Sequence, residues 1–377
     1  MKILKSLKLF VLLLFVVPVY LSAQKTFEKQ FDVKANEKLV IDLETGASIK
    51  VEGWNKNIVS AVAEVGGRNK EEVEFNFEKT SYGVEITSEY LYRDENYNSK
   101  IELKVMVPNK FNVDFKTMGG NVELLGVEGK LEGTTMGGSI DLKNLKGYLD
   151  IKTMGGSIEL TNSEVDGNVE TMGGSILVED VIGDVNASSM GGKVIQKNVK
   201  SSKKSVGKEI DISTMGGSIN IDEALHGANI KTMGGKISVN KVKQFLKAET
   251  MGGDIYVKEA DAWIKAKTMG GDVEVKLNCD PKTDDRDVEL ISMHGDVTLY
   301  VPSNFSMDLD IEIRYSEDDE DEVDIVSDFN IKEEVTEDSK KSHWNKTMIL
   351  HGSASLNGGK NKVEIKTVNG RVYLKKI

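Results

Sequence analysis

The chain contains little cysteine, proline or histidine: its 377 residues include one Cys, four Pro and four His. The single cysteine, Cys279, excludes a disulfide within the chain, so packing and hydrogen bonds must hold the fold together. The four histidines have no metal-ligand spacing, which argues against a zinc site; they are His226, His294, His343 and His351. Nucleophile-elbow and phosphate-loop motifs are also missing. We therefore expect no catalytic residue, no metal and no cofactor.

The chain also has no excess of basic residues, with 49 Lys and Arg against 61 Asp and Glu and a net charge of −12. This balance argues against a nucleic-acid partner and against a basic membrane-binding patch. The longest apolar run, Leu9–Tyr20, is too short for a confident membrane span. Because lysines precede it and Leu21-Ser22-Ala23 follows it, we interpret residues 1–23 as a signal peptide. The mature chain is then expected to be exported, to the periplasm, the outer membrane surface or the medium, without a membrane span.

The chain is instead rich in one four-residue phrase, Thr-Met-Gly-Gly. It begins at Thr117, Thr135, Thr153, Thr171, Ser189 (with Ser for Thr), Thr214, Thr232, Thr250 and Thr268. Looser copies follow at Ser292-Met293-His294-Gly295 and Thr367-Val368-Asn369-Gly370. The first five starts are 18 residues apart, as are the four from Thr214 to Thr268. A fixed short period of this length is typical of a stacked repeat architecture.

Within each unit, counted from its Thr, apolar residues alternate with polar ones. Positions 6 and 8 are mostly branched aliphatic residues, as in Ile158 and Leu160 around Glu159, and positions 15 and 17 repeat the pattern in Leu149 and Ile151. Period-2 alternation indicates strands, and no segment has a helical period. The two glycines suit a sharp corner. We predict an all-β fold, a single-chain parallel β-solenoid with 18-residue coils.

The orientation of the methionine at position 2 stays open at this point. If strand alternation continues through the corner, Thr faces inward and Met outward, which would expose a long apolar stripe typical of a contact surface. If the corner turns Met inward, its flexible thioether fills gaps in the core. We favour the second arrangement, a buried or half-buried ladder, because soluble proteins seldom expose such a stripe.

The flanking segments are β-rich but do not follow the period. We expect residues 24–116 to form an N-terminal cap and irregular first coils, 117–300 the regular solenoid, and 301–377 a C-terminal β segment. The acidic run 317–328 is expected to be a solvated loop, with calcium binding as the alternative. Two insertions, at 201–208 and 279–287, fall in the same part of the unit, either as a binding side or as tolerated loops.

The chain resembles a bacterial family named putative adhesins, related to the head domains of autotransporter adhesins. The resemblance lies in residues 49–54, in Val107-Pro108, in the Thr-x-x-Gly-x-Ile-x-Val coils and in residues 362–370. It covers most of the expected mature chain. It implies an exported β-solenoid of unknown function with no catalytic residues to carry over.

Two classes of function remain. The first is a non-catalytic adhesin-like or structural module that binds a protein or glycan surface ligand through a repetitive solenoid face. The second is a carbohydrate-active solenoid enzyme, for which the acids at position 5 of successive units, Asp254, Asp272 and Asp296, are the candidate acid/base residues. Because most units carry Ser or Lys there and no singular charged cluster stands out, we favour the non-catalytic class.

Overall fold

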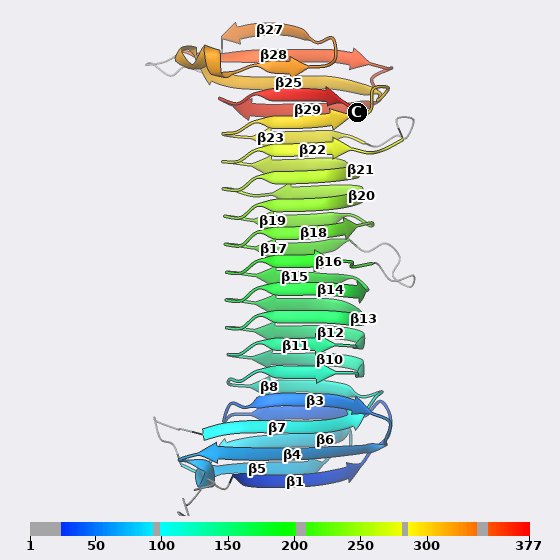
Figure 1. Ribbon diagram of the computed structural model, residues 1–377, viewed down its shortest axis with the longest axis vertical. Coiled ribbons are helices and arrows are strands. Elements are labelled where there is room, and N and C mark those ends of the chain that lie inside the picture. Colours follow the sequence, from blue (N-terminus) through cyan, green and yellow to red (C-terminus); the bar gives the residue numbers. More distant parts are fainter. Residues whose placement is uncertain (1–23, 93–98, 201–208, 281–285, 338–345) are drawn as a thin grey trace, which may run out of the picture.

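The structure, a computed structural model, describes residues 24–92, 99–200, 209–280, 286–337 and 346–377. The prediction of an all-β protein is confirmed, since these residues form a single sheet of 30 strands with two short 3-10 helices. The sheet is mixed, parallel along the middle of the chain and antiparallel near both ends. Figure 1 shows a rod whose strands run across its long axis. The expected signal peptide, residues 1–23, lies outside the described residues, as does the first insertion, 201–208.

The middle of the rod consists of short strands that alternate between two ladders. These strands are β8 (Asn112–Thr117), β9 (Val122–Leu125), β10 (Glu128–Thr135), β11 (Ile140–Lys143), β12 (Lys146–Thr153), β13 (Ile158–Thr171), β14 (Ile176–Ile182), β15 (Val185–Ser189), β16 (Val194–Lys197), β17 (Ile210–Thr214), β18 (Ile219–Ala224), β19 (Ala228–Thr232), β20 (Ile237–Glu249), β21 (Ile255–Thr268), β22 (Val273–Leu277), β23 (Val288–Ser292) and β24 (Val297–Val301).

Each strand pairs in parallel with the strand one repeat away. Leu131 of β10 lies opposite Leu149 of β12, and Ile140 of β11 lies opposite Ile158 of β13, both 18 residues further along. One ladder contains the strand before each Thr-Met-Gly-Gly corner and the other the strand after it. The longer strands β13, β20 and β21 belong to both ladders. Equivalent side chains are therefore stacked at the strand spacing of about 4.8 Å.

The core lies between the two ladders and follows the alternation in the sequence. Ile158, Leu160 and Ile176 are at most 1% exposed, whereas Glu159 is exposed. The corner Thr continues the alternation inward, and Thr135 and Thr153 are buried. The methionines consequently face outward, at 43–52% exposure in ten successive corners. The expectation of a buried or half-buried methionine ladder is wrong, because the strand alternation runs through the corner unbroken.

A second, recurrent corner lies at position 10 of the unit. Its residue adopts a positive φ of 48–68° in five successive coils, at Gly126, Asn144, Asn162, Asp180 and Asn198. Gly, Asn and Asp tolerate this left-handed conformation better than other residues. The chain turns at this position from the second ladder back toward the first.

The N-terminal end of the rod combines parallel and antiparallel strands. Its elements are β1 (Lys25–Asp32), β2 (Lys38–Leu43), β3 (Ser48–Trp54), β4 (Ile58–Gly67), η1 (Lys70–Glu72), β5 (Val73–Lys79), β6 (Gly83–Tyr90) and β7 (Ser99–Pro108). β2 and β3 stack in parallel on β8 and β9, as a first coil would. β4 pairs antiparallel with β1 and β7, and β5 with β6. These pairings cover strand edges that the parallel ladders would otherwise leave open.

The C-terminal end changes the order of its strands. Its elements are β25 (Met307–Ser316), η2 (Glu317–Glu322), β26 (Ile325–Ser327), β27 (Lys332–Glu337), β28 (Thr347–Leu356), β29 (Asn361–Val368) and β30 (Val372–Lys376). The last two strands stack directly on β23 and β24, while β25 and β26 lie outside them. The C-terminus is therefore inside the stack in Figure 1, and the β25–β28–β27 antiparallel strands close the end.

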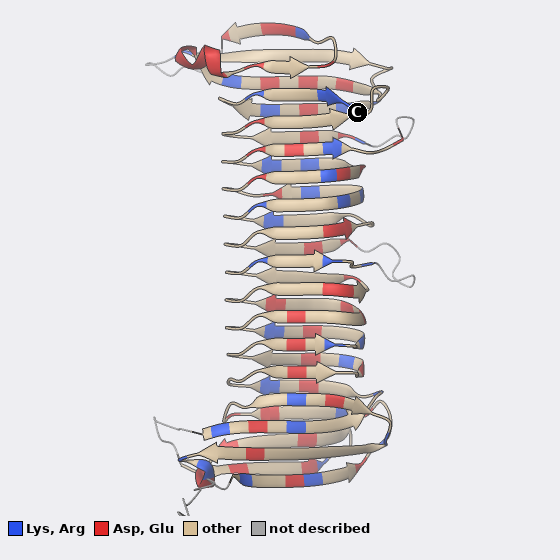
Figure 2. Cartoon of the chain, in the orientation of Figure 1, with Lys and Arg blue, Asp and Glu red and all other residues tan. Residues whose placement is uncertain are grey.

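The acidic run is more structured than the expected solvated loop. Residues Glu317–Glu322 form η2, and Ile325–Ser327 form a strand against β30. The amide of Asn369 donates a hydrogen bond of 3.2 Å to Asp319. In Figure 2 this acidic helix is a local exception, because charges of both signs are spread along the rest of the rod.

Candidate functional site

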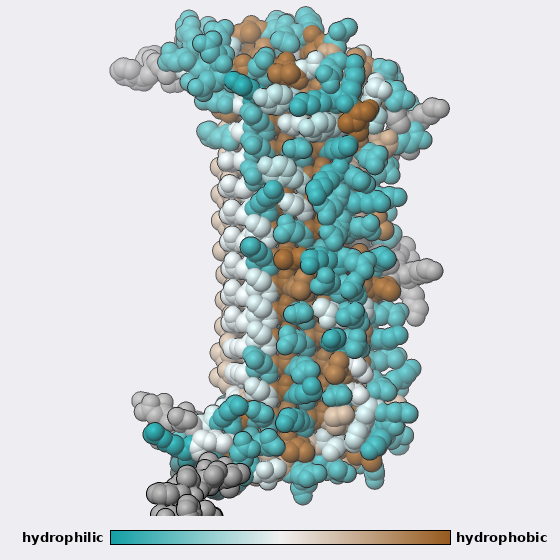
Figure 3. All heavy atoms as spheres, viewed as in Figure 1, coloured by the Kyte–Doolittle hydropathy of each residue, from teal (hydrophilic) through white to brown (hydrophobic). Residues whose placement is uncertain are grey.

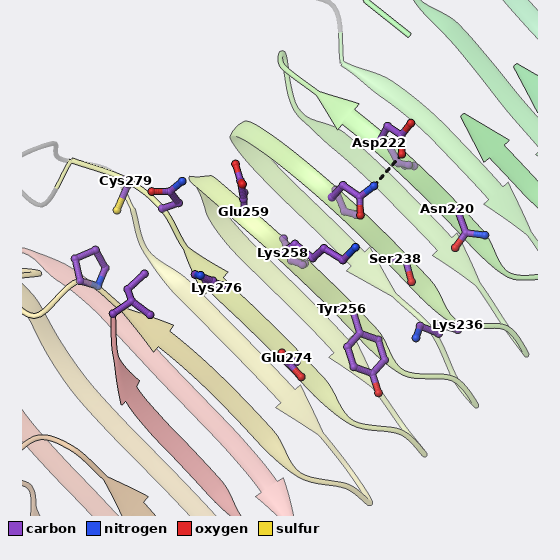
Figure 4. A pocket seen from close by; sticks show the side chains of 17 residues that line it. Asn220, Asp222, Lys236, Ser238, Tyr256, Lys258, Glu259, Glu274, Lys276 and Cys279 are labelled. Carbon is purple, nitrogen blue, oxygen red and sulfur yellow. Dashed lines mark hydrogen bonds between the residues drawn. The ribbon is translucent and has the colours of Figure 1, made fainter. Parts of the chain in front are cut away.

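An open polar groove of about 1100 Å³ crosses the outer face of the second ladder. It extends over β18, β20, β21 and β22 and reaches Pro302 and Ile377 near the C-terminal end. Figure 4 shows its side chains projecting from neighbouring strands toward the same space. The repeat itself creates this arrangement, since positions 7 and 9 of each unit point away from the core in every coil.

Three lysines and three acids line the groove together with amides. The charged residues are Lys236, Lys258, Lys276, Asp222, Glu259 and Glu274, and the amides are Asn220, Asn240 and Asn278. The amide of Asn240 donates a hydrogen bond of 2.8 Å to Asp222 one coil away. The lining is thus charge-balanced and rich in both hydrogen-bond donors and acceptors, a composition suited to neutral polar ligands rather than polyanions.

Tyr256 provides the aromatic surface of the groove. The Lys236 ammonium lies 3.8 Å from the centre of its ring, and its hydroxyl donates a bond of 3.4 Å to Asp254. Partial burial and the nearby carboxylates of Asp254 and Asp272 raise the pKa of Tyr256. The phenol therefore stays protonated at neutral pH and remains a hydrogen-bond donor.

The three stacked acids proposed for the enzyme alternative have a different geometry. Asp254 accepts a hydrogen bond of 3.1 Å from the backbone N–H of Asp272, and Asp272 one of 2.8 Å from that of Asp296. Ser139 and Ser157 accept equivalent bonds from the next coil. The acids thus share with serine the task of tying one corner to the next, which explains their position without catalysis.

The remaining candidates do not converge on one site. His226 contacts Gln244, His294 lies 3.4 Å from the carbonyl of Met269, and His351 lies in β28. His343 is outside the described residues. Across the described ranges, no group of three His, Cys, Asp or Glu side chains is placed to hold a metal ion.

Cys279 lies half-buried at one end of the polar groove. Burial and then the Asp261 carboxylate raise the pKa of its thiol, so the less reactive protonated form predominates at neutral pH. Residues 281–285 of the adjoining insertion lie outside the described residues. At its end, the Arg286 guanidinium forms an ion pair of 2.8 Å with Asp261.

The groove was missed by sequence reasoning, although one signal for it exists. Position 7 is mostly small or acidic, and Tyr256 is the one aromatic residue there among the regular units. Its departure from the pattern marks the coil at which the groove is centred. The residues 18 positions before and after it, Ser238 and Glu274, are its neighbours on the adjacent coils.

No protein-family model and no curated protein matches the chain. Solved structures that resemble it include a putative cell adhesion protein from Clostridium sporogenes, at 10% identity, with 94% of this chain and 100% of that chain covered and a TM-score of 0.19. A putative adhesin from Bacteroides fragilis shares 17% identity, with 65% and 98% covered and a TM-score of 0.31. A putative adhesin from Parabacteroides distasonis shares 18%, with 66% and 95% covered and a TM-score of 0.35. These neighbours carry adhesin names, as the resemblance implied, whereas the relation to autotransporter heads stays a prediction.

Among the described residues, no helix is long and apolar enough to cross a membrane.

Proposed function

We propose that the protein is a non-catalytic, exported, adhesin-like interaction module that binds an extended protein or glycan ligand along the polar groove. The observation that carries the proposal is the groove itself. Its lining comes from equivalent positions of several consecutive coils, as with Ser238, Tyr256 and Glu274. A ligand with its own repeat can contact such a surface several times, and weak contacts then add up to useful avidity.

The proposed scaffold is a single-chain parallel β-solenoid of 18-residue coils over residues 117–300. Residues 24–116 and 301–377 serve as its N-terminal cap and C-terminal β segment, and residues 1–23 as its signal peptide. The parallel pairings at 18-residue offsets support the scaffold, and the antiparallel strands at each end support the caps. Export follows from the basic and apolar leader sequence.

A neutral glycan is the ligand class that the lining favours. Hydroxyl groups can both donate and accept, so they can use the amides, lysines and carboxylates together. The Tyr256 ring adds an apolar surface beside these polar groups. A basic groove would be expected for a nucleic acid or another polyanion, and this groove has as many acids as lysines.

A glycan array followed by titration calorimetry tests the proposal on the purified protein. We expect binding that weakens about tenfold in Tyr256→Ala and stays unchanged in the matched variant Tyr148→Ala, whose ring lies exposed on the other ladder. Removal of the coil 232–249, which contributes Lys236, Ser238 and Asn240, should weaken binding without abolishing it. Equal binding by Tyr256→Ala and the unaltered protein would overturn the assignment of the groove.

The enzyme alternative, a carbohydrate-active solenoid using stacked acids, makes a different prediction. Asp254, Asp272 and Asp296 would then be required for glycan cleavage. Their hydrogen bonds to the next coil supply a structural reason for their presence, so we place this function second. Product release from a labelled glycan, lost in Asp272→Asn, would reverse that order.

A further inference from the structure

Ten exposed methionines form a straight apolar edge along the rod, away from the polar groove. This methionine edge consists of Met118, Met136, Met154, Met172, Met190, Met215, Met233, Met251, Met269 and Met293. Backbone hydrogen bonds between successive corners, such as Met154 N–H to the Thr135 carbonyl, keep the side chains in register. In Figure 3 the left outline of the middle of the rod is a continuous pale strip, next to a face on which hydrophilic side chains are frequent. Exposed apolar stripes of this length are typical of contact surfaces.

The glycine after each methionine keeps this edge free of side chains, and toward both ends of the rod the fold does not require it. In the middle corners the space is tighter, with 3.0–3.2 Å from a Cβ on Gly173, Gly191 or Gly216 to the preceding corner. A Cβ on Gly137, Gly155 or Gly252 would meet its nearest neighbour at 3.6–3.7 Å, an ordinary contact. His294 occupies the same position in the last exposed corner. The fold therefore tolerates a side chain at corners such as Gly137, Gly155 and Gly252, yet these corners also have glycine, which leaves the backbone open to close approach by another surface.

A row of outward-facing residues, here called the charged row, runs beside the methionine edge. Each of its members directly precedes the Thr or Ser of one corner. From the N-terminal end this charged row reads Lys116, Thr134, Lys152, Glu170, Ser188, Ser213, Lys231, Glu249, Lys267 and Ile291. Over the last six coils, the row and the methionines line one shared apolar groove of about 760 Å³. Lys152 pairs with Glu170 at 3.3 Å and Lys231 with Glu249 at 3.5 Å, and all four side chains are 45–66% exposed.

The order of charges in this row is self-complementary when the row is reversed about its midpoint. The midpoint lies between Ser188 and Ser213, whose hydroxyls are 3.0 Å apart. Counting outward from it, Glu170 is matched with Lys231, and Lys152 with Glu249. In a second chain that runs the opposite way, the Lys231–Glu249 pair would therefore face the Lys152–Glu170 pair of the first chain. These four side chains would form a ring of alternating charge, and symmetry would create the ring twice.

We propose that the methionine edge is the interface of an antiparallel homodimer whose twofold axis passes between Ser188 and Ser213. This arrangement places all ten methionines of one copy against the ten of the other. Isologous contact of this kind is the commonest mode of protein oligomerisation. Flexible methionine side chains can interdigitate without needing exact shape complementarity.

The parallel arrangement of two copies is disfavoured by the same residues. A twofold axis along the rod would bring the charged row of one copy opposite position 5 of the other at equal height. Lys231 would then face Lys236, and Glu249 would face Asp254, so like charges would meet at two coils, against one coil where Lys267 would face the opposite charge of Asp272. The antiparallel arrangement brings no like charges together in the charged row.

The length of the edge is compatible with a stable dimer. Ten coils at about 4.8 Å give a strip roughly 45 Å long. A contact roughly 18 Å wide along this strip, covering the charged row as well as the methionines, would reach the 800 Å² or so per partner that specific interfaces usually bury. Apart from Lys236 beside the corner, the polar groove lies on the outer face of the other ladder, so dimerisation leaves its positions 7 and 9 open and the two proposals can fail independently.

Sedimentation velocity of the purified protein over a concentration series tests the proposal. We expect a dimer whose dissociation constant rises roughly tenfold or more in Lys231→Glu and in Glu170→Lys, because each substitution places like charges across the interface twice. The double variant Lys231→Glu/Glu170→Lys should regain most of the lost affinity. The two residues lie three coils apart in one chain, so rescue requires a contact between chains.

Glu179→Lys is the matched control, because it breaks a comparable ion pair with Lys197 (3.5 Å) on the other ladder. We expect it to dimerise like the unaltered protein. A monomer at all concentrations, a dimer insensitive to the single reversals, or a double variant as weak as the single variants would each overturn the proposal.

Discussion

The hydroxyl of Thr171 donates a hydrogen bond of 2.7 Å to the carbonyl of Gly156, which belongs to the preceding corner. The same hydroxyl accepts a bond of 3.2 Å from the N–H of Gly174 in its own corner. One buried side chain thus satisfies two backbone groups from two coils, which is the condition for burying them at low cost. The bond to the preceding corner recurs from Thr135 to Thr367, with Ser replacing Thr in two corners.

Replacing Thr171 tests the value of this bond. Thr171→Val keeps the shape and burial of the side chain but leaves the Gly156 carbonyl and the Gly174 N–H without their partner. We expect a loss of about 1–3 kcal/mol in the free energy of unfolding, measured by urea denaturation. Thr171→Ser should lose clearly less, because Ser189 makes the same bond at 2.8 Å. Equal losses in both variants would show that the methyl group contributes as much as the hydroxyl, which contradicts the expectation.

A second pair of variants tests which side of the strand faces the core. Ile158 is 1% exposed and the next residue, Glu159, is exposed. Ile158→Asp places an unpaired carboxylate in the core and should cost several kcal/mol or prevent folding. Glu159→Ala should change the urea midpoint little. Similar midpoints for the two variants would contradict the register of β13.

The repeated part of this fold could be predicted because each strand pairs with the equivalent strand of the next repeat, so the sequence repeat reports the strand pairing directly. The period gives the register, and alternation such as Ile158-Glu159-Leu160 gives the inward face. The orientation of the methionines was harder to predict from the sequence, because an apolar residue beside two glycines can point either into the core or out of the corner. It is decided by the inward Thr, whose hydroxyl has a bonding partner only inside the corner.

The ends of the rod and the groove could not be predicted for a different reason. Both depend on contacts between segments with no shared repeat, such as β4 with β7 or β29 with β23. The strands were identifiable from their alternation, but nothing local indicates that the final strands insert beneath β25. The groove near Tyr256 likewise reaches Pro302 and Ile377, which only the folded chain brings close.

Mild acid should weaken one ion-pair cluster between neighbouring coils. Burial opposes ionisation of Glu289, but hydrogen bonds from Lys265 (2.6 Å) and Lys267 (2.8 Å) outweigh it and lower the pKa of the carboxyl. Because the pKa of Glu289 is lower in the folded than in the unfolded chain, its ion pairs contribute fully to the free energy of unfolding above the unfolded-chain pKa of 4.5. This contribution is lost as the pH falls through the pKa of the folded chain. The contribution is expected to be below about 1 kcal/mol because the cluster lies at the surface.

Urea midpoints at neutral pH and at a series of pH values below 4.5 measure this effect. Glu289→Gln should be less stable than the unaltered protein at neutral pH, and the difference should shrink as the pH falls. Glu159→Gln, on an exposed face, is the control and should follow the unaltered protein throughout. A difference that stays constant with pH would show that charge on Glu289 contributes nothing.

The two glycines of each corner should respond very differently to the same substitution. A Cβ on Gly253 would lie 2.1 Å from the carbonyl oxygen of Gly235 in the preceding corner, far inside van der Waals contact. A Cβ on Gly252 would meet its nearest neighbour, the Gly234 carbonyl, at 3.6 Å. We expect Gly253→Ala to push two coils apart and to cost several kcal/mol. Gly252→Ala should stay within about 0.5 kcal/mol of the unaltered protein, as is usual for exposed positions. Thermal unfolding followed by circular dichroism compares the two, and comparable losses would mean that the first glycine is kept for folding and not for access to the methionine edge.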